Sequence, residues 1–119
     1  MEPTPQEIEV WYVLPAIRRE LCKSLIIDYK KSQKECSSLL GLTEAAVSHY
    51  IKEKRAKEVT FNKGITEEIK KSAKIVADDK KMLIREIHRL CGLITIKKIV
   101  CELHKKQSEV PLKCKVCLG

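Results

Sequence analysis

The sequence is poor in aromatic residues, which make up 4% of its 119 residues, and it contains no long apolar run. Its apolar stretches fall well short of the roughly 20 residues that cross a membrane, so no membrane partner is expected. The first residues, MEPTPQEIEV, are acidic and lack the apolar core of a signal peptide. We therefore expect a cytoplasmic protein, whose six cysteines serve as ligands, redox groups or small core residues rather than as disulfides.

Groups that would carry out catalysis are also scarce. The sequence has no Gly-rich phosphate loop, and its histidines have no evident nucleophilic partner apart from Cys101 beside His104, which resembles a ligand pair. Cys114 and Cys117 lack the strand-then-helix context that a thiol oxidoreductase needs. The sequence therefore predicts a protein that is not an enzyme and has no small-molecule substrate.

Positive charge, by contrast, is abundant and unevenly placed. The net charge is +8, of which residues 1–14 contribute −3, residues 15–61 contribute +4 and residues 62–119 contribute +7. A basic body favours a polyanionic partner, with nucleic acid the first choice. Many basic proteins have no such partner, so the charge alone does not identify it.

Apolar residues recur at helical spacing along most of the chain. Ile17, Leu21 and Leu25 form one buried stripe between Pro15 and about residue 29. Pro15 is expected to interrupt or kink the helix, or to restart one at its own first turn. A loop is predicted over Thr60–Gly64, and a further helix is expected to open at Thr66. Strand-like alternation is absent, so the fold is predicted to be all-α.

Two functional regions are expected within this helical chain. Residues 1–61 would form an N-terminal helix and a helix-turn-helix module. Residues 62–119 would form amphipathic helices for dimerisation and sensing, followed by a short tail with a Cys-x-x-Cys motif. Candidate dimer interfaces are the apolar stretch Val10–Leu14 and a stripe in the last helix, made of Ile96, Ile99, Val100 and Leu103.

The segment SQKECSSLLGLTEAAVSHYIKEKR, residues 32–55, fits a helix-turn-helix. Ser37 supplies the small side chain required where the two helices cross. Gly41 occupies the turn, where a positive φ is cheap only for glycine, and Thr43 caps the second helix. Val47 and Tyr50 face the core. An αα-hairpin within a bundle is the alternative, but this combination of small residue, glycine and cap favours the helix-turn-helix.

The outward face of the second helix has side chains that suit DNA, because in this motif that face enters the major groove. Ser48 and His49 can bond base edges, Glu44 can accept from a cytosine amino group, and Ala45 can contact a thymine methyl. Flanking polar and basic side chains can reach phosphates. The predicted DNA-binding residues on or beside this face are Gln33, Thr43, Glu44, Ala45, Ser48, His49, Lys52 and Arg55.

The cysteines of the second half have the spacing of a metal site. Two thiolates in Cys-x-x-Cys can bind one metal, and Cys101 and His104 lie one helical turn apart. Four thiolates, from Cys91, Cys101, Cys114 and Cys117, would suit an iron–sulfur cluster or structural zinc. A mixed set, with His104 in place of Cys91, would suit zinc. Incidental cysteines are the remaining alternative, and Cys22 and Cys36 are expected to be core residues.

Two segments, VWYVLPAIRREL at Val10–Leu21 and GLTEAAVSHYIKEKRAK at Gly41–Lys57, resemble a family of archaeal helix-turn-helix transcriptional regulators. The resemblance covers the first half well and extends to the second chiefly through the cysteine and histidine spacing. It implies a dimeric DNA-binding repressor or activator with an Xre/Cro-like module and a cysteine-bearing C-terminal region. It also favours an iron–sulfur cluster, of the four-iron type, over zinc.

These expectations combine into one functional prediction. The chain would be a homodimer that binds double-stranded DNA, with the metal or cluster setting the angle of the last helices and thus the separation of the two reading helices. Half-sites lie about 34 Å apart, so a shift of a few ångströms would weaken binding. The alternative function is a zinc-stabilised helical adaptor that binds proteins.

Overall fold

The computed structural model describes residues 4–52 and 59–107, with the side chains of residues 106 and 107 left out. Every regular element in these residues is helical, and none is a strand, which confirms the all-α prediction. The elements in chain order are α1 (Pro5–Ile8), the π-helical turn η1 (Glu9–Val13), α2 (Leu14–Ile27), α3 (Gln33–Leu40), α4 (Glu44–Ile51), α5 (Lys63–Asp78), the 3-10 turn η2 (Lys80–Met82), α6 (Leu83–Cys91) and α7 (Ile94–Gln107).

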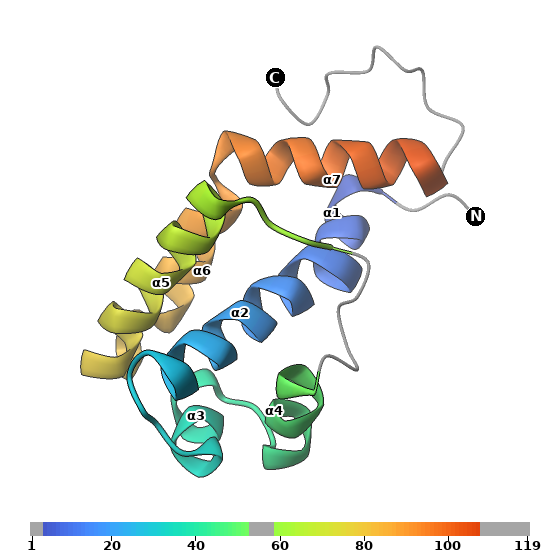
Figure 1. Ribbon diagram of the computed structural model, residues 1–119. Coiled ribbons are helices and arrows are strands. Elements are labelled where there is room, and N and C mark those ends of the chain that lie inside the picture. The colour runs from blue at the N-terminus through green and yellow to red at the C-terminus, as the bar shows by residue number, and fades with distance from the viewer. Residues whose placement is uncertain (1–3, 53–58, 108–119) are drawn as a thin grey trace.

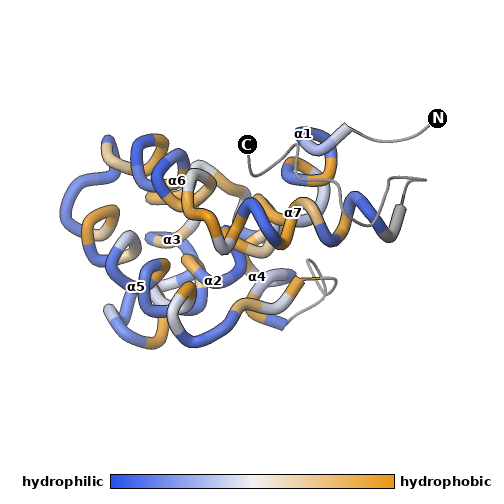
Figure 2. The backbone as a smooth tube through the Cα atoms, turned by 90° about the horizontal axis from the view of Figure 1, so that it is seen from above, coloured by the Kyte–Doolittle hydropathy of each residue, from blue (hydrophilic) through white to orange (hydrophobic). Residues whose placement is uncertain are grey.

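Helix α2 is the central element of the arrangement (Figure 1). Helices α3 and α4 both pack against it, with α3 near its C-terminal end, and α5 packs along its side. Helices α5 and α6 form an antiparallel pair joined by η2, and α7 lies across α1 and η1. Apolar and polar residues alternate along these helices at helical spacing (Figure 2). No helix in the described part of the chain is both long and apolar enough to cross a membrane.

One hydrophobic core connects the two halves of the chain. The predicted stripe Ile17, Leu21 and Leu25 is fully buried. It belongs to the same cluster as Ile69 of α5 and Ile96 of α7, so residues from both expected regions contribute to this core. The position of α2 and of the α3–α4 pair is therefore fixed by contacts with the second half of the chain as well as the first.

The first helix passes through Pro15 without a break, because the chain widens into a π-turn just before it. A proline ring inside a helix clashes with the carbonyl four residues earlier, here that of Trp11, and it has no N–H to donate. In η1 the Leu14 N–H instead bonds the Glu9 carbonyl, five residues back. Ile8 and Val13, five residues apart, are consequently both fully buried.

The loop predicted over residues 60–64 is shorter than expected. Helix α5 begins at Lys63, three residues before the predicted start at Thr66, because Asn62 is an N-cap whose Oδ1 accepts the Ile65 N–H at 2.9 Å. The inner face of α5 contains Ile65 and Ile69, which lie four residues apart and are both buried. Asn62, within the predicted loop, is one of the residue types that favour the N-cap position, and it therefore starts the helix earlier.

Candidate functional site

The α3–α4 pair is built by caps and a glycine turn. Ser32 and Glu35 form a reciprocal capping box at the start of α3. Gly41 ends α3 with φ +64°, a left-handed conformation that other residues adopt only with strain. Thr43 then starts α4, accepting the Ala46 N–H at 3.0 Å. The turn between the helices is closed by the Ser37 hydroxyl, which donates to the Leu42 carbonyl.

Helix α4 presents a polar face to solvent. Val47 and Tyr50 are buried against the core, as predicted. The predicted DNA-binding residues lie on the remaining surface, and they differ in how far they are exposed. Thr43, Glu44, Ala45 and Lys52 are exposed, and so is Gln33 at the start of α3, whereas Ser48 and His49 are half-buried at the edge of that face; Arg55 lies outside the described residues.

Helix α2 supports this face from behind. It packs against both α3 and α4. Cys22 of α2 and Cys36 of α3 are fully buried, as expected for core residues, and their thiols hydrogen-bond to each other. This hydrogen bond and the burial raise the pKa of the Cys22 thiol above its ordinary value. A protonated Cys22 thiol buried in the core is inert, so the contact serves packing between α2 and α3.

The predicted metal ligands are only partly within the described residues. Cys101 is buried and His104 half-buried, one turn apart on α7. Cys114 and Cys117 lie outside the described residues. Within the described ranges, no three His, Cys, Asp or Glu side chains gather as a metal-binding group, so Cys91, Cys101 and His104 do not form one together. Each of the two expected ligand sets uses only two of these three.

Cys91 is the less suitable ligand of the described residues. It is half-buried at the end of α6. Burial raises the pKa of its thiol to about 12, with further contributions from the negative charge of Glu9 and a hydrogen bond to that carboxylate. A metal binds the thiolate, so this surrounding opposes the ionised form that a ligand requires. Cys101 and His104 lie one turn apart on α7, whereas the Cys91 thiol is hydrogen-bonded to Glu9, so the described residues fit the mixed set better.

A polar network between α5 and α6 was not predicted from the sequence. The Arg89 guanidinium donates to the Glu86 carboxylate at 3.1 Å, to the Glu68 carboxylate at 2.8 Å and to the Ser72 hydroxyl at 2.9 Å. Ser72 in turn donates to Glu86 at 2.7 Å. Ser72 and Glu86 are buried. The sequence shows Glu68 and Ser72, and likewise Glu86 and Arg89, at the spacing that places them on one face of a helix. It does not indicate that these two helices pack against each other.

The two candidate dimer interfaces differ in the structure. Ile96 and Val100 of the α7 stripe are buried within the chain, with Ile99 and Leu103 packed against the same core. That stripe is occupied by α1 and η1, so its assignment to a dimer interface was wrong. Val10 and Trp11 of η1 remain more than half exposed, at 55% and 53%.

Comparison with known proteins assigns no family to the chain. It matches no family model, no curated protein and no solved structure. Its function is therefore inferred from its own residues and from how the structure places them.

Proposed function

We propose that the protein is a sequence-specific transcriptional regulator that binds double-stranded DNA as a homodimer and is not an enzyme. The observation that carries this proposal is the surface of α4. Its apolar side is fixed in the core, whereas Glu44, Ala45, Ser48 and His49 lie on the solvent side, directly after a glycine turn and a Thr43 cap. The resemblance of residues 10–21 and 41–57 to archaeal helix-turn-helix regulators supports the same function.

The chemistry of this face fits a division between base contacts and phosphate contacts. Ser48 and His49 supply donors and acceptors for base edges in the major groove. Lys52, exposed at the end of α4, and Gln33, exposed at the first position of α3, flank this face and would contact phosphates. The net charge of +8 adds a general attraction to DNA.

Replacing Ser48 or His49 with alanine is expected to weaken binding to the cognate site by about 1–3 kcal/mol each, because each change removes a base contact. Binding to random DNA should change much less. The cognate site would first be selected from a random oligonucleotide pool, and both affinities measured by fluorescence anisotropy. Equal losses on the two DNAs would exclude a base-reading role for these side chains.

Lys52→Ala and Arg55→Ala are the matched controls. Each should weaken binding to both DNAs alike and reduce the slope of log K against log salt by about one, because each removes a phosphate contact. A protein-binding adaptor is the alternative function. Such a protein would not bind DNA with an affinity that falls steeply as the salt concentration rises. That result would contradict the proposed function as a whole.

The homodimer is proposed to form through the surface around Val10 and Trp11. The α1–η1 segment carries Glu7 and Glu9 and no basic residue, and it lies against α7, which has exposed Lys97 and Lys98. In a twofold contact each patch meets the same patch of the second copy, so an acidic segment beside a basic helix is self-complementary. Exposed tryptophan is also frequent where interface energy is concentrated.

Trp11→Glu is expected to weaken dimerisation by about 30-fold or more, as for a central interface aromatic. Trp11 is the only tryptophan, so its fluorescence reports this contact alone. Dilution of the natural protein should shift the emission to longer wavelength as the dimer dissociates, in step with the mass from light scattering. Ile84→Glu, at a residue 81% exposed on α6, should leave the dimer intact. An emission maximum independent of concentration, with a dimer present, would place the interface elsewhere.

The metal or cluster is proposed to be held in the C-terminal region. Cys101 and His104 of α7 would hold it together with Cys114 and Cys117, and Cys91 is the alternative to His104. Bound zinc would fix these ligands relative to one another, whereas an iron–sulfur cluster would also supply redox sensitivity. Because α7 packs on α1 and η1, a change in α7 would reach the proposed dimer surface directly.

A further inference from the structure

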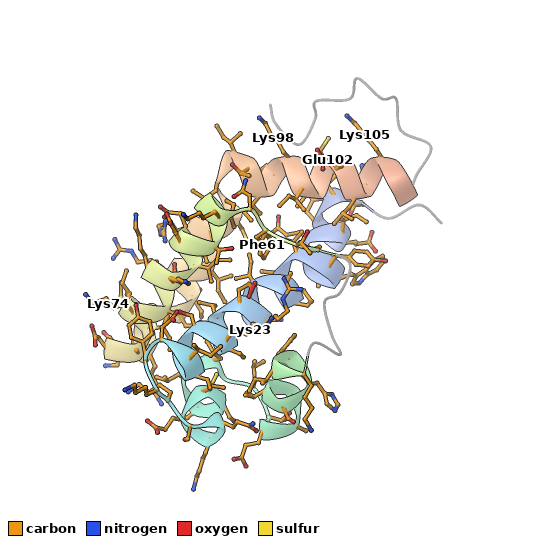
Figure 3. The ribbon with its side chains drawn as sticks, in the orientation of Figure 1. Lys23, Phe61, Lys74, Lys98, Glu102 and Lys105 are labelled. Carbon is orange, nitrogen blue, oxygen red and sulfur yellow. The ribbon has the colours of Figure 1, made fainter. Side chains whose placement is uncertain are left out.

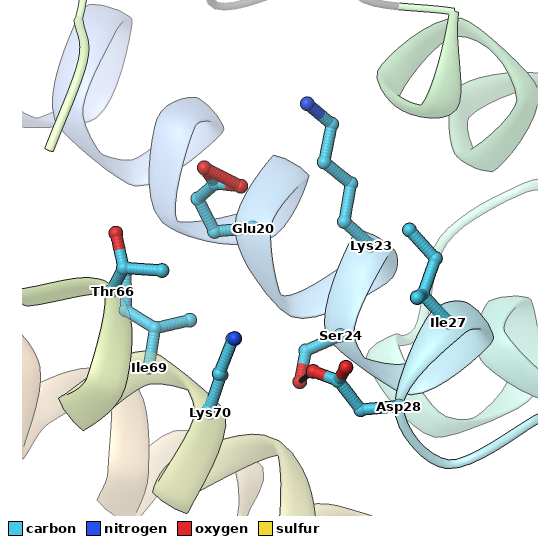
Figure 4. A pocket seen from close by; sticks show the side chains of 8 residues that line it. All are labelled: Glu20, Lys23, Ser24, Ile27, Asp28, Thr66, Ile69 and Lys70. Atoms are coloured by element: carbon cyan, nitrogen blue, oxygen red, sulfur yellow. Dashed lines mark hydrogen bonds between the residues drawn. The ribbon is translucent and has the colours of Figure 1, made fainter. Parts of the chain in front are cut away.

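A groove of about 220 Å³ lies between α2 and α5, apart from α4 and from the cysteines (Figure 4). Its α2 side is lined by Glu20, Lys23, Ser24 and Ile27, together with Asp28 just after the helix, and its α5 side by Thr66, Ile69 and Lys70. The proposed regulator function uses none of these side chains.

The polar groups of the groove are acceptors and one cation, Lys23, on the α2 side, and the cation Lys70 on the α5 side. The Ser24 hydroxyl donates to the Asp28 carboxylate at 2.9 Å, so both oxygens keep lone pairs free to accept further hydrogen bonds. The Lys70 side chain lies across from this pair in the close-up view. Its ammonium has no ion-pair partner in the described part of the chain. The Tyr29 hydroxyl, one residue after Asp28, donates to the Lys70 carbonyl at 3.4 Å and links the two sides of the groove.

Apolar side chains form the remainder of the lining. Ile69 is buried at the base of the groove, and Ile27 stands at its rim with 71% of its surface exposed. An aliphatic group placed against Ile27 would cover apolar surface that now faces water, which is favourable in proportion to the area removed from solvent. A ligand that fits the groove therefore needs an aliphatic part as well as charges.

We infer that this groove binds a free aliphatic α-amino acid. Its ammonium would donate to Asp28 and Ser24, its carboxylate would pair with Lys70, and its side chain would lie against Ile27. Charge-assisted hydrogen bonds of this kind are among the strongest in proteins. Ligand pockets for drug-sized molecules occupy about 300–1,000 Å³, so the smaller groove fits a single amino acid better than a peptide or a nucleotide.

The mixed charge of the groove also selects against ligands of one sign. A phosphate or nucleotide would face the carboxylates of Glu20 and Asp28, and a polyamine would face the ammonium groups of Lys23 and Lys70. A molecule that carries both charges close together would meet Asp28 with its cation and Lys70 with its anion. The groove shares α2 with the α3–α4 pair, so bound ligand would couple to DNA affinity if it favoured one position of α2 over another.

The inference is tested by the melting temperature of the full chain with L-leucine, L-isoleucine or L-valine at millimolar concentration, followed by titration calorimetry. At least one of them should raise the melting temperature, since a ligand of the folded state stabilises it. N-acetyl-leucine lacks the ammonium and leucinamide lacks the carboxylate, so each should bind about ten-fold or more weakly. Inorganic phosphate and spermidine should give no shift at matched ionic strength.

Two variants locate the site. Lys70→Gln and Asp28→Asn should each weaken binding of the amino acid about ten-fold or more. Lys74→Gln is the control, because Lys74 lies one turn further along α5 and is directed away from the groove (Figure 3), and it should leave the affinity unchanged. The inference would be overturned if none of the three amino acids shifted the melting temperature, or if phosphate or spermidine shifted it more. It would also be overturned if N-acetyl-leucine or leucinamide bound equally well, or if all three variants lost the same affinity.

Discussion

Arg89→Met is expected to lower the free energy of unfolding by about 2–3 kcal/mol. The substitution keeps the apolar stem and removes the guanidinium, which leaves the Glu86 carboxylate buried with only the Ser72 hydroxyl as its partner. Glu86 is 4% exposed, so water cannot replace the lost donor. The expected loss in the free energy of unfolding is smaller than for a fully buried ion pair, because the Arg89 side chain itself is 37% exposed. Urea unfolding followed by circular dichroism at 222 nm measures it.

Two further variants separate the buried charge from the loss of a surface ion pair. Lys71→Met removes an exposed ion pair to Glu68, 3.2 Å long, and should change stability by less than about 0.5 kcal/mol. Adding Glu86→Leu to Arg89→Met should recover most of the loss, because the uncompensated carboxylate is then gone. A loss from Arg89→Met no larger than that from Lys71→Met would mean that Glu86 finds water after all.

Replacing both Cys114 and Cys117 by serine is expected to remove the bound metal or cluster completely. Serine is a much poorer ligand than a thiolate for zinc or iron at neutral pH, and no remaining pair of ligands would hold the ion. Helical content should fall only modestly, because the core around α2 is built from residues of the described helices. Metal is measured by plasma emission spectrometry and visible absorption on protein purified without oxygen. Retention of the full metal content would exclude both cysteines as ligands.

The same measurement distinguishes the two ligand sets. His104→Ala should deplete the metal if the mixed set is used, whereas Cys91→Ser should deplete it if four cysteines hold a cluster. The hydrogen bond between Cys91 and Glu9 and the raised pKa of that thiol favour the first outcome. Loss of metal in both variants would require a site with five ligands, which neither set describes.

Much of the fold could be predicted because its local signals are strong. The glycine turn at Gly41 and the cap at Thr43 each fix a helix boundary through one or two hydrogen bonds between near neighbours. The buried faces of α2 and α5 follow from apolar residues at helical spacing. The outward face of α4 could be derived in the same way, since its apolar residues determine which side is left for solvent.

Features that depend on pairing between distant helices could not be predicted. The stripe on α7 shows that this helix buries one face, but the sequence does not say whether the partner is α1 or a second copy. The Arg89 network requires α5 and α6 to be placed first. The groove on α2 likewise appears only when Asp28 and Lys70, far apart in the sequence, are brought together. For Cys114 and Cys117, the prediction still rests on their spacing.

The π-turn η1 has a consequence for how sequences should be aligned to this one. Between Ile8 and Val13 the helix contains one residue more than a regular α-helix would need to keep both on the same side. A homologue with an uninterrupted α-helix would therefore align with a single-residue gap between these two positions. A gap placed elsewhere would rotate one part of the helix by about 100° relative to the other and match exposed positions to buried ones. Searches that penalise any gap within a helix would score such homologues too low.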